Sequence, residues 1–270
     1  MVPVDERSAR NERAILHARA GLGSFTMARH PVSAELAPFV EYLWSVEWDR
    51  RRLAPYEQRL LPTPATHLSV QPGLARVVGP RRTAFRTTLT GQGWVIGVRF
   101  RPGGARPWSP GPLSELVDGE FPVTLLADLD AAALQAAVRA APDVAAAAAL
   151  VDAALVPHRP APDPTVDRVS ALVATVDAEP GLRRVEQLAE RAGLGVRALQ
   201  RLCAEWIGIG PKELVRWARL HEAAARAASG MVDWAALAAE LGYADQAHLV
   251  RDFSRVVGEP PARYARAQQG

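Results

Sequence analysis

One short pattern occurs twice near the end of this chain, and it restricts the fold more than any other feature. The two copies span residues 185–203 and 234–253. In each, a short run with small and apolar residues at helical spacing ends at a glycine, Gly193 or Gly242, which tolerates a positive φ beyond a helix end. A second helical run begins within a few residues. The pattern predicts two helix-turn-helix units.

A single long helix is predicted between the two copies. Pro211 sits where a first helical turn tolerates it, Leu214 and Leu220 follow on one face, and Ser229 and Gly230 end the helix. Roughly eighteen residues at about 1.5 Å per residue span roughly 27 Å. This length is close to one turn of DNA, about 34 Å, so one chain can hold two recognition helices in successive major grooves.

The last hundred or so residues resemble the DNA-binding domain of the AraC/XylS family of bacterial transcription regulators. The residues that carry the resemblance are Leu199, Gln200 and Arg201, residues 207–211, Arg219 and Leu220, then Ala238, residues 241–243, Leu249, Phe253 and residues 258–264. The resemblance implies a cytoplasmic, nucleoid-associated regulator that binds double-stranded promoter DNA in a sequence-specific way. If it activates transcription, it also contacts RNA polymerase.

Residues that read DNA should lie on the exposed face of the second helix of each unit. In the first unit this face holds Val196, Arg197, Gln200 and Arg201. Arg197 and Arg201 are one turn apart, and each can make a bidentate pair with guanine, while Gln200 can bond adenine or a phosphate. A solvated charged face without a DNA partner is the alternative interpretation.

The second unit is expected to be the weaker reader. Its exposed face holds Gln246, Ala247, Val250 and Arg251, followed by Arg255. Ala247 and Val250 offer little beyond contact with a thymine methyl group, and Asp252 opposes phosphate. We expect Arg251 and Arg255 to anchor this unit on the DNA backbone.

The N-terminal half is predicted to be rich in β-structure. Strands are expected at 40–48, 57–61, 66–71, 75–78, 87–91 and 94–100, with prolines and glycines between them. This spacing is typical of a small antiparallel barrel or sandwich. Helices are expected at 131–140 and 144–155, packed on the barrel or on a twin subunit. The fold class is therefore α+β, with an all-α C-terminal domain.

A ligand pocket is one interpretation of the aromatic residues in this half. The candidate pocket residues are Trp44, Trp48, His67, Trp94, Arg99 and Phe100, with Trp108 as a further aromatic wall. An arginine there would donate to an anion. The alternative is that the aromatic side chains fill the barrel core. Residues 30–130 also resemble an uncharacterised N-terminal domain of some actinobacterial-type regulators, which implies no known ligand.

Composition shifts suggest four segments. Residues 1–26 are polar and unpatterned and are expected to be a disordered tail, with Met27 as an alternative start. Residues 27–156 form the β-rich domain, which either senses a small molecule or dimerises. Residues 157–164 are a proline-rich linker, and residues 165–270 are the DNA-binding domain.

Charge and motifs limit the other function classes. Residues 165–270 hold 14 Arg and Lys against 13 Asp and Glu, so bulk charge cannot drive DNA binding. The six histidines are scattered, and neither a Gly-x-Ser-x-Gly motif nor a phosphate-binding loop occurs, so no catalytic residue, metal or cofactor is expected. Cys203 is expected to be a buried apolar residue, and no membrane span is expected. The competing hypothesis is a ligand-binding or interaction protein whose DNA domain has low affinity.

Overall fold

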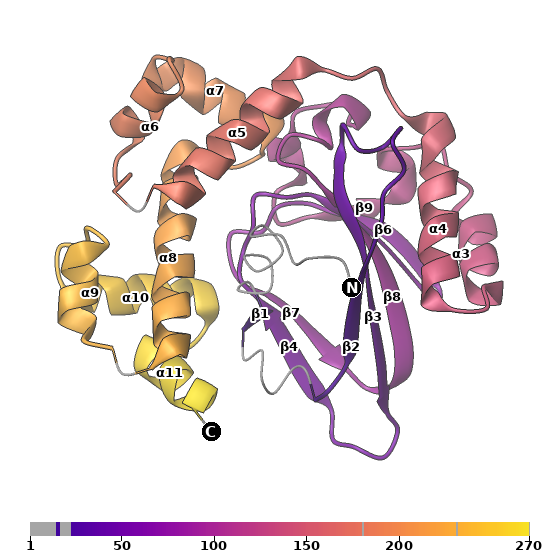
Figure 1. The fold of residues 1–270 in the computed structure, drawn as a ribbon, viewed down its shortest axis with the longest axis horizontal. Coiled ribbons are helices and arrows are strands. Elements are labelled where there is room, and N and C mark those ends of the chain that lie inside the picture. Colours follow the sequence, from indigo (N-terminus) through magenta and orange to yellow (C-terminus); the bar gives the residue numbers. More distant parts are fainter. Residues whose placement is uncertain (1–14, 17–22, 180, 231, 270) are drawn as a thin grey trace.

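The computed structural model describes residues 15–16, 23–179, 181–230 and 232–269. A β-rich N-terminal domain is followed by a C-terminal domain of helices (Figure 1). Within the described residues, no helix is long and apolar enough to cross a membrane.

The β-rich domain contains two antiparallel sheets. The larger sheet has the strand order β2 (Thr26–His30), β3 (Val40–Arg50), β8 (Gly91–Phe100), β5 (His67–Gln71), β6 (Leu74–Val78) and β9 (Glu120–Pro122). The smaller sheet has the order β1 (Ile15–Leu16), β4 (Tyr56–Leu60) and β7 (Phe85–Leu89). Each predicted strand is present, with ends shifted by up to three residues, whereas β1, β2 and β9 were not predicted.

The two faces of the larger sheet have different partners. One face packs on helices α3 (Ala131–Ala140) and α4 (Val144–Leu155), and Leu43, Val98 and Phe100 are fully buried there. The opposite face turns toward the smaller sheet. Because side chains alternate along a strand, the neighbours of these core residues point to that second face. Helices α3 and α4 therefore pack on the sheet of their own chain (Figure 1).

Several short 3₁₀ helices complete this domain. They are η1 (Arg106–Trp108), η2 (Leu113–Leu116), η3 (Val123–Leu125) and η4 (Val156–His158). The carboxylates of Asp130 and Asp143 accept hydrogen bonds from backbone amides at the starts of α3 and α4, and so cap both helices.

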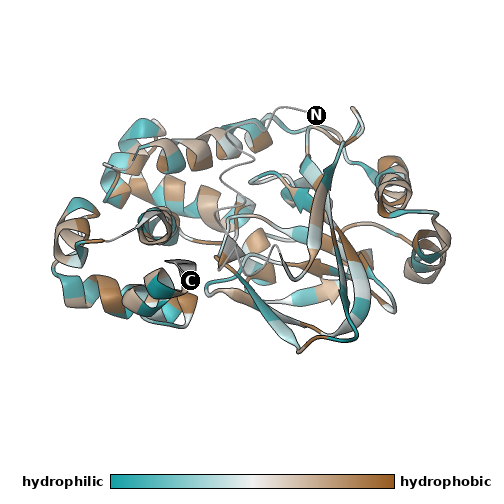
Figure 2. Cartoon of the chain, turned by 60° about the horizontal axis from the view of Figure 1, so that its bottom comes forward, coloured by the Kyte–Doolittle hydropathy of each residue, from teal (hydrophilic) through white to brown (hydrophobic). Residues whose placement is uncertain are grey.

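The C-terminal domain has the two predicted helix-turn-helix units on either side of a long helix. Its helices are α5 (Pro164–Ala178), α6 (Val185–Arg191), α7 (Val196–Trp206), α8 (Pro211–Ser229), α9 (Trp234–Glu240), α10 (Gln246–Val257) and α11 (Pro261–Gln269). Gly193 and Gly242 have positive φ values of 62° and 72°, as the turns require. Hydrophobic residues recur along these helices between hydrophilic ones (Figure 2).

Two separate cores hold this domain together. The first half of α8 packs with α5, α6 and α7 around Leu188, Leu199 and Trp217. The second half packs with α9, α10 and α11 around Leu249 and Phe253. Each helix-turn-helix unit is thus fixed to its own end of α8.

The segment 1–26 differs from the expected disordered tail where the structure describes it. Leu16 is buried and lies in a strand that pairs with β4, and Phe25 is also buried. These two apolar side chains pack against the folded protein, although they lie in a polar stretch whose composition predicts disorder. The other residues of 1–22 lie outside the described residues. The linker 157–164 was expected to be extended, but η4 occupies its start and α5 begins at Pro164.

The β-rich domain contacts both ends of the helical domain. The guanidinium of Arg106 donates to Glu205 at the end of α7 at 2.6 Å. The amide of Ala84 donates to the carbonyl of Val256 near the end of α10 at 2.9 Å. Between them, His221 of α8 donates from Nε2 to the carbonyl of Pro62 at 2.8 Å.

Candidate DNA-binding surface and ligand cavity

Helix α7 separates a buried face from an exposed one. Leu199 and Cys203 are fully buried against the first core. Arg197, Gln200 and Arg201 are exposed, and Val196 is half-buried. The structure therefore places all four predicted residues of this unit on or beside the exposed face.

Helix α10 has the same organisation. Leu249 and Phe253 are buried, and Gln246, Ala247 and Arg251 are exposed, with Val250 half-buried. His248, near the start of the helix, is exposed as well, and its ring packs edge-on against Tyr243 at 5.1 Å. Sequence reasoning missed His248, although it is next to Ala247 and carries a donor that base edges can accept.

Asp252 was expected to oppose phosphate, and the structure shows that its carboxylate is buried and paired within its own domain. Arg216 of α8 donates from Nε to its carboxylate at 2.9 Å, Arg255 donates at 2.7 Å, and the Tyr243 hydroxyl donates at 3.0 Å. Burial alone would raise the pKa of Asp252, but the Arg255 hydrogen bond and the Arg216 charge hold that pKa below its usual value. Arg255 is exposed yet bonded to Asp252, so part of its charge is already neutralised.

The two exposed faces are set apart by α8. This helix has 19 residues, so its length is about 28 Å at about 1.5 Å per residue. Helices α6 and α7 lie at one end of α8, and α9 and α10 lie at the other (Figure 1). That separation approaches the roughly 34 Å between successive major grooves on one side of DNA.

A cavity of about 240 Å³ lies between the two sheets of the N-terminal domain. Trp44, Trp48, His67 and Arg99 line it, in agreement with the predicted positions. Phe100 does not line it, because it is the strand neighbour of Arg99 and points into the core beside Trp108.

The placement of Trp94 in the pocket was wrong for the same reason. Trp94 shares the parity of Phe100 along β8 and packs against the helix-covered core. Sequence reasoning also missed cavity residues on the facing strands β4 and β7 and beyond β6, among them Gln58, Phe85 and Arg81. Only the pairing of strands far apart in the chain brings these together.

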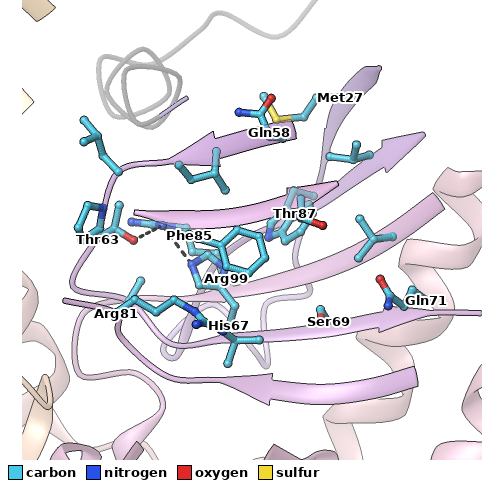
Figure 3. Close-up of a pocket in the computed structure, with 18 of the residues that line it drawn as sticks. Met27, Gln58, Thr63, His67, Ser69, Gln71, Arg81, Phe85, Thr87 and Arg99 are labelled. Carbon is cyan, nitrogen blue, oxygen red and sulfur yellow. Dashed lines mark hydrogen bonds between the residues drawn. The ribbon is translucent and has the colours of Figure 1, made fainter. Parts of the chain in front are cut away.

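Arg99 is the most tightly held charge in the cavity wall. Its Nε donates to Glu41 at 2.8 Å, and its Nη1 donates to the hydroxyl of Thr63 at 3.2 Å. The same Nη1 lies 3.4 Å from Nε2 of His67 (Figure 3). Burial, together with the charge of Arg99, lowers the pKa of His67 to about 3, so its ring is neutral near pH 7.

A second cavity of about 590 Å³ separates the β-rich domain from α5 and α8. Arg99 and Glu41 line it on one side, and Asp167, Asp177 and His221 line it on the other. Its wall carries both signs of charge, which distinguishes it from the cavity between the sheets.

Cys203 is the sole cysteine, and it is fully buried. Burial raises the pKa of its thiol to about 12. The prediction of a small buried apolar side chain is confirmed, because a thiol with this pKa is not a nucleophile near pH 7.

Two family models match the chain, one in each half. Residues 28–122 match a domain of unknown function (DUF6597), and residues 188–267 match a helix-turn-helix domain. No curated protein matches the chain.

The chain is similar to solved structures of ToxT from Vibrio cholerae. One is 11% identical and covers 92% of this chain and 100% of that chain, with a TM-score of 0.41. Another, with an unsaturated fatty acid bound, is 10% identical and covers 90% and 95%, with a TM-score of 0.37. Likeness at these values carries no argument about what this chain binds. The family matches do assign the two halves: the chain joins a DUF6597 domain to a C-terminal domain that belongs to the AraC-type helix-turn-helix DNA-binding domains.

Proposed function

We propose that this chain is a sequence-specific transcription regulator that reads two successive major grooves of promoter DNA with α7 and α10. The observation that carries the proposal is the pair of exposed helix faces, each with its predicted contact residues, at the two ends of one 19-residue helix. The N-terminal domain acts as the sensor, through the cavity between its sheets.

The two helices have unequal roles in this proposal. Arg197, Gln200 and Arg201 give α7 three side chains that can bond base edges. Helix α10 offers Gln246 and His248 near its start, beside the small apolar Ala247. We therefore assign most of the sequence readout to α7, and assign α10 to anchoring and a smaller share of readout.

The alternative function is a ligand-binding protein whose helical domain binds DNA with low affinity. The near-balanced charge of residues 165–270 favours this alternative. It predicts weak binding that does not distinguish one DNA sequence from another.

The deciding experiment measures binding of the full chain to the DNA upstream of its own gene and to a random duplex, across a salt series. If about six phosphates are contacted, log K should fall with log salt at a slope of about −5. Arg197→Ala and Arg201→Ala should each lower specific affinity by about 1–3 kcal/mol and leave random-duplex affinity nearly unchanged.

Arg139→Ala is the matched control, because Arg139 is an equally exposed arginine on α3, away from both helix-turn-helix units. Its affinity for either duplex should equal that of the wild type. Equal and weak binding of the wild type to both duplexes would instead favour the alternative function. The proposal places the protein in the cytoplasm, and if it activates transcription, it contacts RNA polymerase.

A further inference from the structure

Buried polar atoms without hydrogen-bond partners gather around the cavity between the sheets. Among the described residues, these include Nδ1 of His67, Nε of Arg76, Nε of Arg81 and Oε1 of Gln58, and all four residues line that cavity. Native interiors leave few such atoms, because each one costs about 1–3 kcal/mol. Four of the residues that line this one cavity therefore carry a hydrogen-bonding group that a ligand can satisfy.

Three of these four atoms are donors. The Nε atoms of Arg76 and Arg81 each carry a proton. Nε2 of His67 faces a guanidinium that can only donate, so Nε2 accepts and the neutral ring carries its proton on Nδ1. A ligand that satisfies these three donors must therefore present acceptor oxygens.

The charge of the cavity wall also favours a ligand that carries acceptor oxygens. The lining residues include the arginines Arg29, Arg76, Arg81 and Arg99, and none of the described lining residues is Asp or Glu. Outside the lining, Glu120 bonds both Arg76 and Arg81, and Glu41 bonds Arg99, so two carboxylates face three guanidinium groups. This arrangement leaves an excess positive charge that favours an anion.

The rest of the wall is apolar and aromatic. Trp44 and Trp48 line the cavity from β3, and Phe85 lines it from β7. Figure 3 shows Phe85 among the lining residues. Gly97 makes room for the Trp44 ring, since a Cβ there would lie 2.0 Å from it. At about 240 Å³ the cavity is smaller than the roughly 300–1,000 Å³ of drug-sized ligand pockets, so its occupant has one or two rings.

From these observations we propose that the cavity binds a small aromatic acid. Its acid group accepts hydrogen bonds from Arg81, Arg76 and His67, and its ring lies among Trp44, Trp48 and Phe85. This inference rests on the proposed function, in which the N-terminal domain is the sensor, and it names the chemical class of what is sensed.

The test titrates the purified full chain with benzoate, phenylacetate and indole-3-acetate, and with the amide of each acid. Binding is followed by calorimetry and by the fluorescence of the tryptophans in the cavity wall. We expect at least one acid to bind about tenfold or more tightly than its amide, a preference of about 1.4 kcal/mol.

Arg81→Gln should remove most of that preference and leave amide binding nearly unchanged. Arg82→Gln is the matched control for acid binding, because Arg82 is the next residue, is more exposed and bonds Asp118 and Glu213, both outside the cavity. Circular dichroism establishes that both variants are folded.

Three results would overturn the proposal: amides that bind as tightly as acids, equal effects of Arg81→Gln and Arg82→Gln, or no binding of any of the three acids by the folded protein. DNA binding is measured on the same preparation without acid. Loss of acid binding with intact DNA binding rejects this inference alone, and the reverse outcome rejects the proposed regulator alone.

Discussion

His67 makes the stability of the N-terminal domain depend on pH. Its pKa is lowered to about 3 in the folded chain, mainly by burial and also by Arg99, against about 6.5 in an unfolded chain. Between these values the unfolded chain binds the proton and the folded chain does not. The free energy of unfolding therefore does not depend on this residue's protonation above pH 6.5. As the pH falls from 6.5 toward about 3, His67 lowers the free energy of unfolding by about 1.4 kcal/mol per pH unit.

His67→Gln should remove this slope. Urea unfolding at several values between pH 6.5 and pH 4.5 should show a stability loss smaller by about 1.4 kcal/mol per pH unit than in the wild type. His221 is present in both proteins, and burial lowers its pKa too, so its contribution cancels in the comparison. Parallel pH profiles would show that His67 is protonated in the folded chain.

The cavity residues show which part of a site the sequence can predict. Four residues were correctly predicted to line the cavity: Trp44, Trp48, His67 and Arg99. Each lies on a strand that the sequence predicts, because turn residues mark where the strand begins and ends. Phe100 and Trp94 were misplaced because the aromatic character of a residue was given more weight than the alternation of side chains along a strand. Applied to β8, that alternation alone separates Arg99 from Phe100.

One buried ion pair joins α8 to α10 beside the apolar core that the two helices share. Asp252 is 5% exposed, and its bond to Arg216 joins the central helix to the second recognition helix. Arg216→Met leaves the buried carboxylate with only Arg255 and Tyr243 as partners. We expect this variant to lose about 3 kcal/mol of unfolding free energy, because removing one partner of a buried ion pair is costly.

Arg216→Met combined with Asp252→Asn should lose less than Arg216→Met alone, since the charge is removed together with its partner. Arg251→Met, one position from Asp252 but exposed, should stay within about 0.5 kcal/mol of the wild type. Urea unfolding of the four proteins measures these differences. A double variant that is the least stable of all would contradict the assigned role of the pair.

At the scale of elements, the helical domain was more predictable than the β-rich one. Its signals are local: Gly193 and Gly242 end two helices, and Pro211 begins the long one. Strand β2 was missed because its five residues have no apolar alternation, and it depends on pairing with β3. The docking of Leu16 was missed because its partners are distant in sequence: it pairs with Arg59 of β4 and packs in the core around Leu249 and Phe253, and these segments meet only in the folded chain.

At the scale of the whole molecule, one of the segments through which the cavity wall touches the DNA-binding domain contains Leu61 and Pro62. Leu61 lines the cavity and is also buried in the second core, with Leu220 of α8 and Phe253 of α10. The next residue, Pro62, accepts the hydrogen bond from His221. A ligand in the cavity therefore contacts Leu61, which also packs in the core of the second helix-turn-helix unit.

This shared wall predicts that acid binding and DNA binding are coupled. Coupling of about 1–3 kcal/mol corresponds to an affinity change of about 5–150-fold, and it must be reciprocal. The acid that binds in the titration should change DNA affinity by a factor of about five or more. Saturating DNA should change the affinity for that acid by the same factor. Calorimetry with each ligand in the presence and absence of the other measures both.

Leu61→Ala should reduce the coupling factor toward one, because it shortens the side chain that joins cavity and core. Val46→Ala is the control: Val46 also lines the cavity, where it is half-buried, but it lies on β3 and outside the second core. Both variants enlarge the cavity and should weaken acid binding, yet only Leu61→Ala should uncouple it from DNA. Equal coupling in the two variants would mean that the signal passes elsewhere, and the mixed-charge cavity beside α5 and α8 would be the next route to test.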